Sequence, residues 1–383
     1  MTGNEPSKKT NALLAPAILF ILLAASIIAP KGIFGTSDVN LVPSPNENQS
    51  GLSISPNGHE IAFSSWNSTI DNVCLVTDPL RGCIRGATTQ ISHIWIMNSD
   101  GSGRRQLTTG NMGQFHPVFS PDGTRILYLR SEYNISTDIF ETYLWIMYKD
   151  GTAQEKLAKA FFGSFSEDGT KILYGDRDYH YNCTIWSMDV DGGSKAHLVD
   201  GFDIRNAFYV DHGSKMIFFN YSQISVLDLG TGQTVVVAEL PGPTYRQIAG
   251  AEIIRFDEVL PTPDPERIMF SGPDSCWEGY CPGNGIFTIG IDGTGVTFHG
   301  RGGDNIVYIS NDNILFVKNH AKKDDLVVFN LTSGKTHVLL EVSPPKNINA
   351  HDLSPDGKKI FFQVGTQCCS ESGDIRWLPN PYR

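Results

Sequence analysis

Histidine side chains are the first candidates for chemistry in this chain of 383 residues. His116 and His351 each stand a few residues before an S-P-D-G segment, and several histidines gathered at one place could bind a metal ion. The remaining histidines, such as His93 and His299, do not recur at matching positions. We therefore expect His116 and His351 to have structural roles, and we predict no metal site and no cofactor.

Acidic residues offer a second candidate, because the D-V-D-G segment from Asp189 is typical of the start of a calcium loop. Such a loop needs glutamate at its twelfth position, where this chain has Asp200. The same D-G pair recurs at Asp100, Asp150 and Asp292, which favours a hairpin turn. The sequence also contains no G-x-S-x-G nucleophile motif. We predict no catalytic residue, so an enzyme is the less favoured class.

Six of the seven cysteines form couples that are close in sequence. The couples are Cys74 with Cys83, Cys276 with Cys281, and Cys368 with Cys369. In an oxidising compartment such couples indicate disulfides, whereas in a reducing one they remain thiols or metal ligands. Their spacing does not match a zinc site, because no second C-x-x-C half or histidine pair accompanies them. Cys183 is left over.

The first thirty residues differ from the rest of the chain. Residues 12–29 carry no charge, Lys8 and Lys9 precede them, and Lys31 follows them. A helix of this length rises about 27 Å, close to the roughly 30 Å of a bilayer's hydrocarbon core. Basic residues on the N-terminal side favour keeping that end in the cytoplasm. We expect these parts: 1–11 cytoplasmic, 12–30 a single-pass transmembrane signal anchor, 31–38 a linker, and 39–383 outside the cytoplasm, at the cell surface or in the periplasm.

A cleaved signal peptide is the alternative, because Ala24-Ala25-Ser26 could serve as a small-residue cleavage site. The protein would then be secreted. Six N-x-S/T sequons agree with export in either case. The net charge of -11 repels phosphate backbones, so nucleic acid is not an expected partner.

Internal repeats dominate the remaining sequence. One unit reads FHPVFSPDGTRILYLRS from Phe115 and YLWIMYKDG from Tyr143, and the next reads FFGSFSEDGTKILYGDR from Phe161 and TIWSMDVDGG from Thr184. S-P-D-G is typical of a tight turn, and the apolar runs around it predict four strands per unit, A to D, which make one propeller blade. The turn positions are Asn57, Asp122, Asp168, Asp211, Asp264, Asp312 and Asp356. We predict an all-β, seven-bladed β-propeller of four-stranded blades, preceded by the transmembrane helix.

The seventh unit lacks a strand D of its own. At the other end of the chain, Leu41 lies 14 residues before Ser55, much as Leu107 lies 13 residues before Ser120. We therefore predict that a strand over Asn40–Pro43 completes blade seven, which closes the ring and removes an exposed sheet edge.

These units, with their S-P-D-G turns, D-I-W-like third strands and L-T endings, resemble the TolB-type (WD40-like) propeller repeat over roughly Val39 to Arg383. The resemblance implies the fold. The family includes periplasmic TolB, the gating propellers of prolyl-oligopeptidase relatives and oligogalacturonate lyases, so it does not imply one function. Seven units instead of six, and no separate N-terminal α/β domain, distinguish this chain from TolB itself.

The connections between strands B and C are the predicted binding face. They vary in length, the longest being the loop from Ser65 to Ser92 in the first unit, and they carry aromatic and charged clusters. Variable loops on a rigid scaffold commonly carry recognition, although such loops can also merely cap the propeller. The candidate residues are Glu132, Tyr133, Asp176, Arg177, Asp178, Tyr179, His180, Tyr181, Trp277, Glu278 and Tyr280.

Two functions fit these observations. We expect a non-catalytic binding or scaffold module that recognises a protein, peptide or glycan outside the membrane. The alternative is an extracytoplasmic carbohydrate-active enzyme that works in the propeller funnel, like an oligogalacturonate lyase. Three or more histidines or carboxylates converging in the funnel would favour the enzyme.

Overall fold

The computed structural model divides the chain into two units, residues 1–37 and 38–383. It describes residues 39–40, 47–67, 71–78, 82–89, 91–240, 256, 258–273, 284–301, 304–320, 323–343, 346–366 and 373–382. The expected transmembrane segment and linker lie outside these residues. Within the described ranges, no helix is long and apolar enough to cross a membrane.

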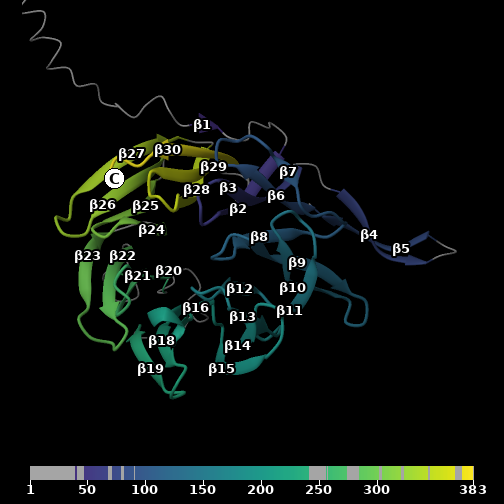
Figure 1. The fold of residues 1–383 in the computed structure, drawn as a ribbon, viewed down its shortest axis with the longest axis horizontal. Coiled ribbons are helices and arrows are strands. Elements are labelled where there is room, and N and C mark those ends of the chain that lie inside the picture. The colour runs from purple at the N-terminus through teal and green to yellow at the C-terminus, as the bar shows by residue number, and fades with distance from the viewer. Residues whose placement is uncertain are drawn as a thin grey trace, which may run out of the picture. The chain divides into compact units, whose positions relative to one another are not determined.

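The described part of the second unit forms seven four-stranded antiparallel sheets, which are the blades of a propeller (Figure 1). Blade one contains β2 (Glu47–Ile54), β3 (Glu60–Asn67), β6 (Ser92–Asn98) and β7 (Arg105–Gln106). Blade two contains β8 (Gln114–Phe119), β9 (Arg125–Asn134), β10 (Ile139–Tyr148) and β11 (Glu155–Lys159). Blade three contains β12 (Phe162–Phe165), β13 (Lys171–Arg177), β14 (Asn182–Asp189) and β15 (Ala196–Phe202).

The other four blades follow the same A-to-D order. Blade four contains β16 (Asn206–Val210), η1 (Asp211–Gly213, a 3-10 helix), β17 (Lys215–Phe219), β18 (Gln223–Asp228) and β19 (Thr234–Glu239). Blade five contains β20 (Glu258–Pro261), β21 (Arg267–Pro273), β22 (Asn284–Gly290) and β23 (Thr297–Arg301). Blade six contains β24 (Asp304–Ser310), β25 (Asn313–His320), β26 (Lys323–Asn330) and β27 (Thr336–Val342). Blade seven contains β28 (Lys346–Leu353), β29 (Lys359–Thr366), β30 (Gly373–Pro379) and β1 (Val39–Asn40).

The S-P-D-G segments form the tight A–B turns predicted for them. In blade two, the Ser120 hydroxyl donates to an Asp122 carboxylate oxygen at 2.5 Å, and the same oxygen accepts the Thr124 N–H at 2.9 Å. Gly123 has φ 70°, a left-handed conformation that glycine adopts without the steric cost of a Cβ. In blade seven, the hydroxyl of Ser354 makes the same bond and lowers the pKa of Asp356 to about 2.

The hydrophobic core is divided among the contacts between neighbouring blades. Seven clusters of buried side chains lie among the described residues, one for each neighbouring pair of blades. The cluster between blades seven and one contains Ile61, Phe63, Phe361 and Ile375, all at most 1% exposed. Burial of side chains this large contributes about 1.5–3 kcal/mol each, so this cluster is a major part of ring closure.

Blade seven is completed by the N-terminal strand, which confirms the predicted closure. β1 pairs antiparallel with β30, placing Val39 opposite Trp377 and Asn40 opposite Arg376. The observed strand covers Val39–Asn40, one residue earlier than expected, and the rest of the predicted segment lies outside the described residues. The two ends of the propeller sequence therefore share one sheet.

The long B–C connection of blade one differs from the loop expected there. It forms a separate two-stranded sheet of β4 (Asp71–Asp78) and β5 (Gly82–Thr89). The Cys74–Cys83 disulfide, predicted from the sequence, joins these two strands with an Sγ–Sγ distance of 2.08 Å. Backbone pairing and a covalent bond thus give structure to a segment whose composition alone predicts only a loop.

Candidate binding surface

The B–C connections of blades two and three, residues 131–142 and 176–182, form what we call the B–C face. In blade two, β9 and β10 pair without interruption from Arg125–Tyr148 to Asn134–Ile139. The hairpin end carries exposed apolar side chains, with Ile135 66% exposed and Phe140 51% exposed. The Phe140 ring lies 5.4 Å from the ring of Tyr133, whose hydroxyl donates to Asp138.

Glu141 anchors the base of this hairpin. Its carboxylate accepts hydrogen bonds from Asn134 Nδ2 at 2.7 Å and from the Tyr143 hydroxyl at 2.9 Å, and it pairs with Lys159 Nζ at 3.2 Å. The Asn134 bond is the main cause that lowers the pKa of Glu141. Burial, followed by the bond to Glu141, raises the pKa of Tyr143 to about 12, so this phenol remains a donor at neutral pH. The network fixes the hairpin against its blade.

Glu132, another predicted face residue, belongs to an ion pair on the same hairpin. Its carboxylate lies 2.7 Å from Lys156 Nζ, which also lies 3.2 Å from the centre of the Tyr143 ring. A cation over an aromatic face is attracted by the ring quadrupole, so Lys156 joins the strand-D edge to the hairpin. This ion pair holds the hairpin in place and leaves its apolar tip exposed.

The blade-three connection is organised around Asp178. Its carboxylate accepts the backbone N–H of His180 at 2.8 Å and of Asn182 at 2.9 Å, together with Asn182 Nδ2 at 2.8 Å. The Asn182 side-chain bond is the largest cause that lowers the pKa of Asp178. The resulting turn presents Tyr179, which is 82% exposed and has its ring centre 3.8 Å from that of His180.

Arg177 and Asp176 lie at the base of this connection. The Arg177 guanidinium stacks between two rings, 4.7 Å from Phe161 and 5.2 Å from Tyr181. Burial raises the pKa of Asp176, and the nearby charge of Lys159, which belongs to blade two, opposes that rise. The two blades therefore share one electrostatic environment at this face.

All eight described face residues lie on these two neighbouring connections. The structure adds Phe202, which is 57% exposed and lies opposite Asn182 in the β14–β15 register. Phe140 was missed although it lies in the predicted connection between Ser131 and Tyr143, because only the clusters of aromatic and charged residues were chosen there. Phe202 was missed because it lies outside the predicted B–C connections. An aromatic residue within a predicted loop was the available signal for Phe140. Trp277, Glu278, Tyr280, Cys276, Cys281, Cys368 and Cys369 lie outside the described residues.

The two histidines singled out by the sequence lie on the first strands of blades two and seven. His116 sits in a β-bulge of β8 with φ 54°, and its ring meets the edge of Phe115 at 5.5 Å. His351 lies on β28, opposite Phe362. In the described part of the chain, no group of three or more histidine, cysteine or acidic side chains is arranged to hold a metal ion. Cys183 is a buried thiol, and burial raises its pKa.

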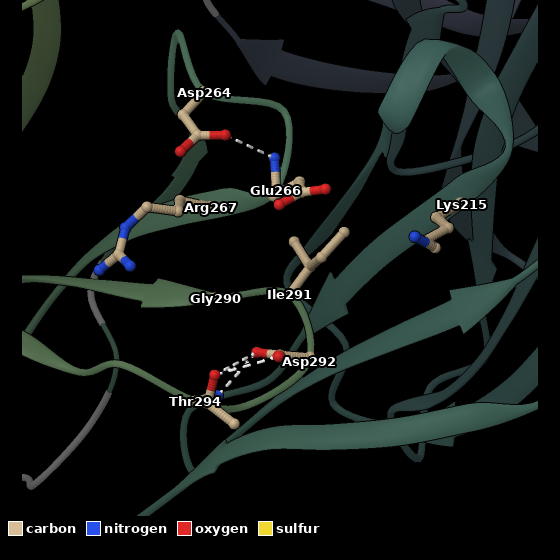
Figure 2. Close-up of a pocket in the computed structure, with 8 residues that line it drawn as sticks. All are labelled: Lys215, Asp264, Glu266, Arg267, Gly290, Ile291, Asp292 and Thr294. Carbon is tan, nitrogen blue, oxygen red and sulfur yellow. Dashed lines mark hydrogen bonds between the residues drawn. The ribbon is translucent and has the colours of Figure 1, made fainter.

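A second surface lies at the opposite ends of the blades, where the sequence predicts only tight turns. A pocket of about 350 Å³ lies there, on the blade-four side of the turns of blade five. Figure 2 shows the residues that line it. Lys215, Asp264, Glu266 and Asp292 line it together with Arg267, whose guanidinium is turned away from Lys215. Arg267 also lines a larger pocket of about 460 Å³ on the blade-six side.

Comparisons with known proteins support the fold. An oligogalacturonate lyase in complex with manganese is 13% identical, with 92% of this chain and 95% of that chain covered and a TM-score of 0.64. The β-propeller domain of the Trilobed protease from Pyrococcus furiosus is 14% identical, with 88% and 94% covered and a TM-score of 0.55. The chain has a seven-bladed propeller fold. TolB from Acinetobacter baumannii is 15% identical, with 76% of this chain and 63% of that chain covered and a TM-score of 0.45.

A curated relative is similar over part of the chain. Dipeptidyl-peptidase 5 from Porphyromonas endodontalis is 31% identical over 177 residues, which cover 41% of this chain. The chain spans only 22% of the length of that relative. No protein-family model matches the chain.

Proposed function

We propose that this chain is a non-catalytic binding module that recognises a protein, peptide or glycan through the B–C face. The observation that carries this proposal is the exposure of Phe140 and Tyr179 on two connections with hydrogen-bonded bases, together with the exposure of Phe202 at the end of β15, opposite Asn182. Aromatic side chains held in place in the free protein lose little conformational entropy on binding, and they commonly dominate binding energy.

We also propose that the propeller is held outside the cytoplasm by residues 12–30. The uncharged run with its basic flank supports this location, and the Cys74–Cys83 disulfide suits an oxidising compartment. Externally added protease should therefore cleave the propeller in intact cells, and protection of the propeller would contradict this location.

The binding proposal is tested with the full chain in detergent micelles, applied to a glycan array and a displayed peptide library. We expect selected ligands to bind at least roughly tenfold more weakly to the F140S/Y179S double variant, because each aromatic contact contributes on the order of 1.5–3 kcal/mol. The matched control is V236S/V296S, since these apolar side chains are also exposed but lie in other blades. Selected ligands that bind both variants equally well would contradict the proposed face.

An extracytoplasmic carbohydrate-active enzyme is the second candidate. The fold similarity to oligogalacturonate lyases covers nearly the whole chain, so lyase activity is the first enzymatic activity to test. Incubation of the full chain with oligogalacturonate, followed by absorbance of the unsaturated product, distinguishes the two proposals. Product formation at a rate proportional to protein concentration would favour the enzyme over the non-catalytic binding module.

A further inference from the structure

A groove between blades five and six lies at the turn ends of the blades, away from the B–C face. Its volume of about 460 Å³ falls within the range of small-molecule sites. The lining includes Arg267 and Thr288 from blade five, His299 from β23, and Tyr308 from β24. Polar groups from two blades thus converge on one concave surface, to which neither proposed function assigns a role.

Arg267 has no acidic residue opposite it in the strand register, unlike its counterparts in blades three and four. Lys171 opens strand B of blade three opposite Asp189, and the two form an ion pair at 2.5 Å. Lys215 lies opposite Asp228 in blade four, where it forms an ion pair with Asp211 at 3.0 Å. In blade five the residue opposite Arg267 is Gly290, which has no side chain to offer.

The guanidinium of Arg267 is held in position by neutral partners. Nη2 donates to Thr288 Oγ1 at 3.0 Å and to the Gly295 carbonyl at 2.8 Å. Among the described residues this guanidinium forms no ion pair, and Nη2 is the nitrogen that donates to protein acceptors. Its charge still acts on Asp292, whose pKa is lowered mainly by the hydrogen bonds from Thr294 and to a smaller extent by Arg267. A half-buried cation in a chain of net charge -11 therefore keeps one edge of its donor fork available.

Thr288 connects Arg267 to His299 through two hydrogen bonds. Because Thr288 Oγ1 accepts from Arg267, its own hydrogen can be donated to His299 Nε2, which lies 2.9 Å away. Burial lowers the pKa of His299, and a hydrogen bond with the Leu331 backbone opposes that shift. A neutral imidazole is consistent with this arrangement, so Arg267 remains the cation of the groove.

Tyr308 supplies a second donor from the neighbouring blade. Its side chain is half-buried in the groove, and its hydroxyl has no hydrogen-bond partner among the described residues. Burial raises the pKa of Tyr308, so the phenol keeps its proton at neutral pH. An available phenol and an unpaired guanidinium edge suit an oxygen anion.

The acidic residues at the rim restrict the charge of the ligand. Asp312 accepts the Thr332 hydroxyl at 3.1 Å, and Asp264 accepts the Glu266 N–H at 3.0 Å. These two carboxylates line the groove and repel a ligand in proportion to its negative charge, so a dianion is disfavoured more than a monocarboxylate. We infer that this groove binds a small monocarboxylate, with Arg267 making the ion pair and Tyr308 donating a second hydrogen bond.

The test is calorimetric titration of the full chain with two carboxylates and their neutral counterparts. N-acetylglycine represents a peptide C-terminus and glucuronate a sugar acid, while N-acetylglycinamide and glucose lack the charge; inorganic phosphate at pH 8 provides a dianion. We expect at least one carboxylate to bind roughly tenfold more tightly than its neutral counterpart and than phosphate. The stronger of the two carboxylates identifies the source of the ligand.

Variants locate the binding. R267Q should weaken carboxylate binding roughly tenfold or more, and Y308F roughly threefold to tenfold, since it removes one hydroxyl from an otherwise unchanged ring. The control is Y209F, because Tyr209 is also half-buried between blades but its hydroxyl bonds Ser187 at 2.7 Å. Equal binding of acid and amide, no binding of any probe, or unchanged binding by Y308F would each overturn the inference. Y308F keeps the test valid even where R267Q fails to fold.

Discussion

At the scale of single residues, the most unusual ionisable group is Asp352 on β28. It lies opposite Phe361 in the strand register, and its carboxylate accepts the Leu353 N–H at 2.7 Å. Burial raises the pKa of Asp352 to about 6, because low-dielectric surroundings disfavour the charged form. The folded protein therefore holds this proton more tightly than the unfolded chain does. At neutral pH the ionised side chain opposes folding, and this cost disappears as the pH falls from about 6 toward 4.

D352N should stabilise the protein at pH 7. Asparagine keeps an oxygen acceptor for the Leu353 N–H but carries no charge, so we expect a gain on the order of 1–2 kcal/mol that vanishes below about pH 4. Thermal unfolding of the full chain at pH 7, 5.5 and 4 measures the difference. The exposed Asp191 provides the control, because D191N should leave the difference small at every pH. A D352N protein less stable than the wild type at pH 7 would contradict this account.

At the scale of elements, the β4–β5 hairpin is an addition to blade one. It forms its own two-stranded sheet, and one of its described contacts with the propeller is the hydrogen bond from Asn111 Nδ2 to the Cys74 carbonyl at 3.1 Å. Two-stranded sheets are marginally stable alone, so the disulfide contributes mainly to local order. The disulfide thus has the same role in blade one as the hydrogen bonds at the bases of the B–C connections in blades two and three, which give order to the exposed tips.

C74S/C83S should change the hairpin and leave the blades intact. Removing the cross-link frees a short loop whose closure contributes about 2–3 kcal/mol in the denatured-state model, but opening the hairpin does not expose the cores between blades. We expect the unfolding midpoint to stay nearly constant while limited proteolysis cuts residues 71–89 much faster. The control is V236S/V296S, which also carries two serine substitutions but at exposed positions in other blades. A drop of many degrees in the midpoint would show that the hairpin supports the whole propeller.

At the scale of the whole molecule, the ring is closed twice. Backbone hydrogen bonds join β1 to β30, and a buried cluster packs blade seven against blade one. Each blade of a propeller packs only against its two neighbours, so opening the ring at one place exposes the edges of two blades. The strand supplied by the N-terminus therefore has more effect on stability than its two residues suggest.

Replacing residues 36–44 by a glycine-serine linker of equal length tests this closure. The chain keeps its length and its N-terminal segment, but strand C of blade seven loses its partner. We expect a loss of about 2 kcal/mol or more, from unmade backbone hydrogen bonds and exposed apolar surface. The unfolding midpoint of the full chain in detergent measures this loss of stability. The control is a glycine-serine replacement of the exposed turn 230–233. An unchanged midpoint would show that the packing between blades closes the ring without β1.

The sequence by itself determined the repeating features of this protein. Seven turns such as Ser120–Gly123 predict seven blades, because the hydrogen bonds and the positive φ of a turn like this one arise within a few residues. The alternating apolar strands and the Cys74–Cys83 couple are also local, so the blade pattern and the disulfide could be predicted. The closing strand followed from spacing, since it occupies the strand-D position that the last repeat lacks.

Only the tertiary structure decided which side chains meet across blades. Arg267, His299 and Tyr308 line one groove although Tyr308 comes from the next repeat, and no local pattern relates their orientations. The contact of Lys159 with the environment of Asp176 likewise depends on the packing angle of two sheets. Such contacts arise when independent repeats pack through their buried faces, and the residues at the ends of those faces are not constrained by the repeat. The groove therefore depends on two repeats, with Arg267 opposite Gly290 in blade five and Tyr308 contributed by blade six.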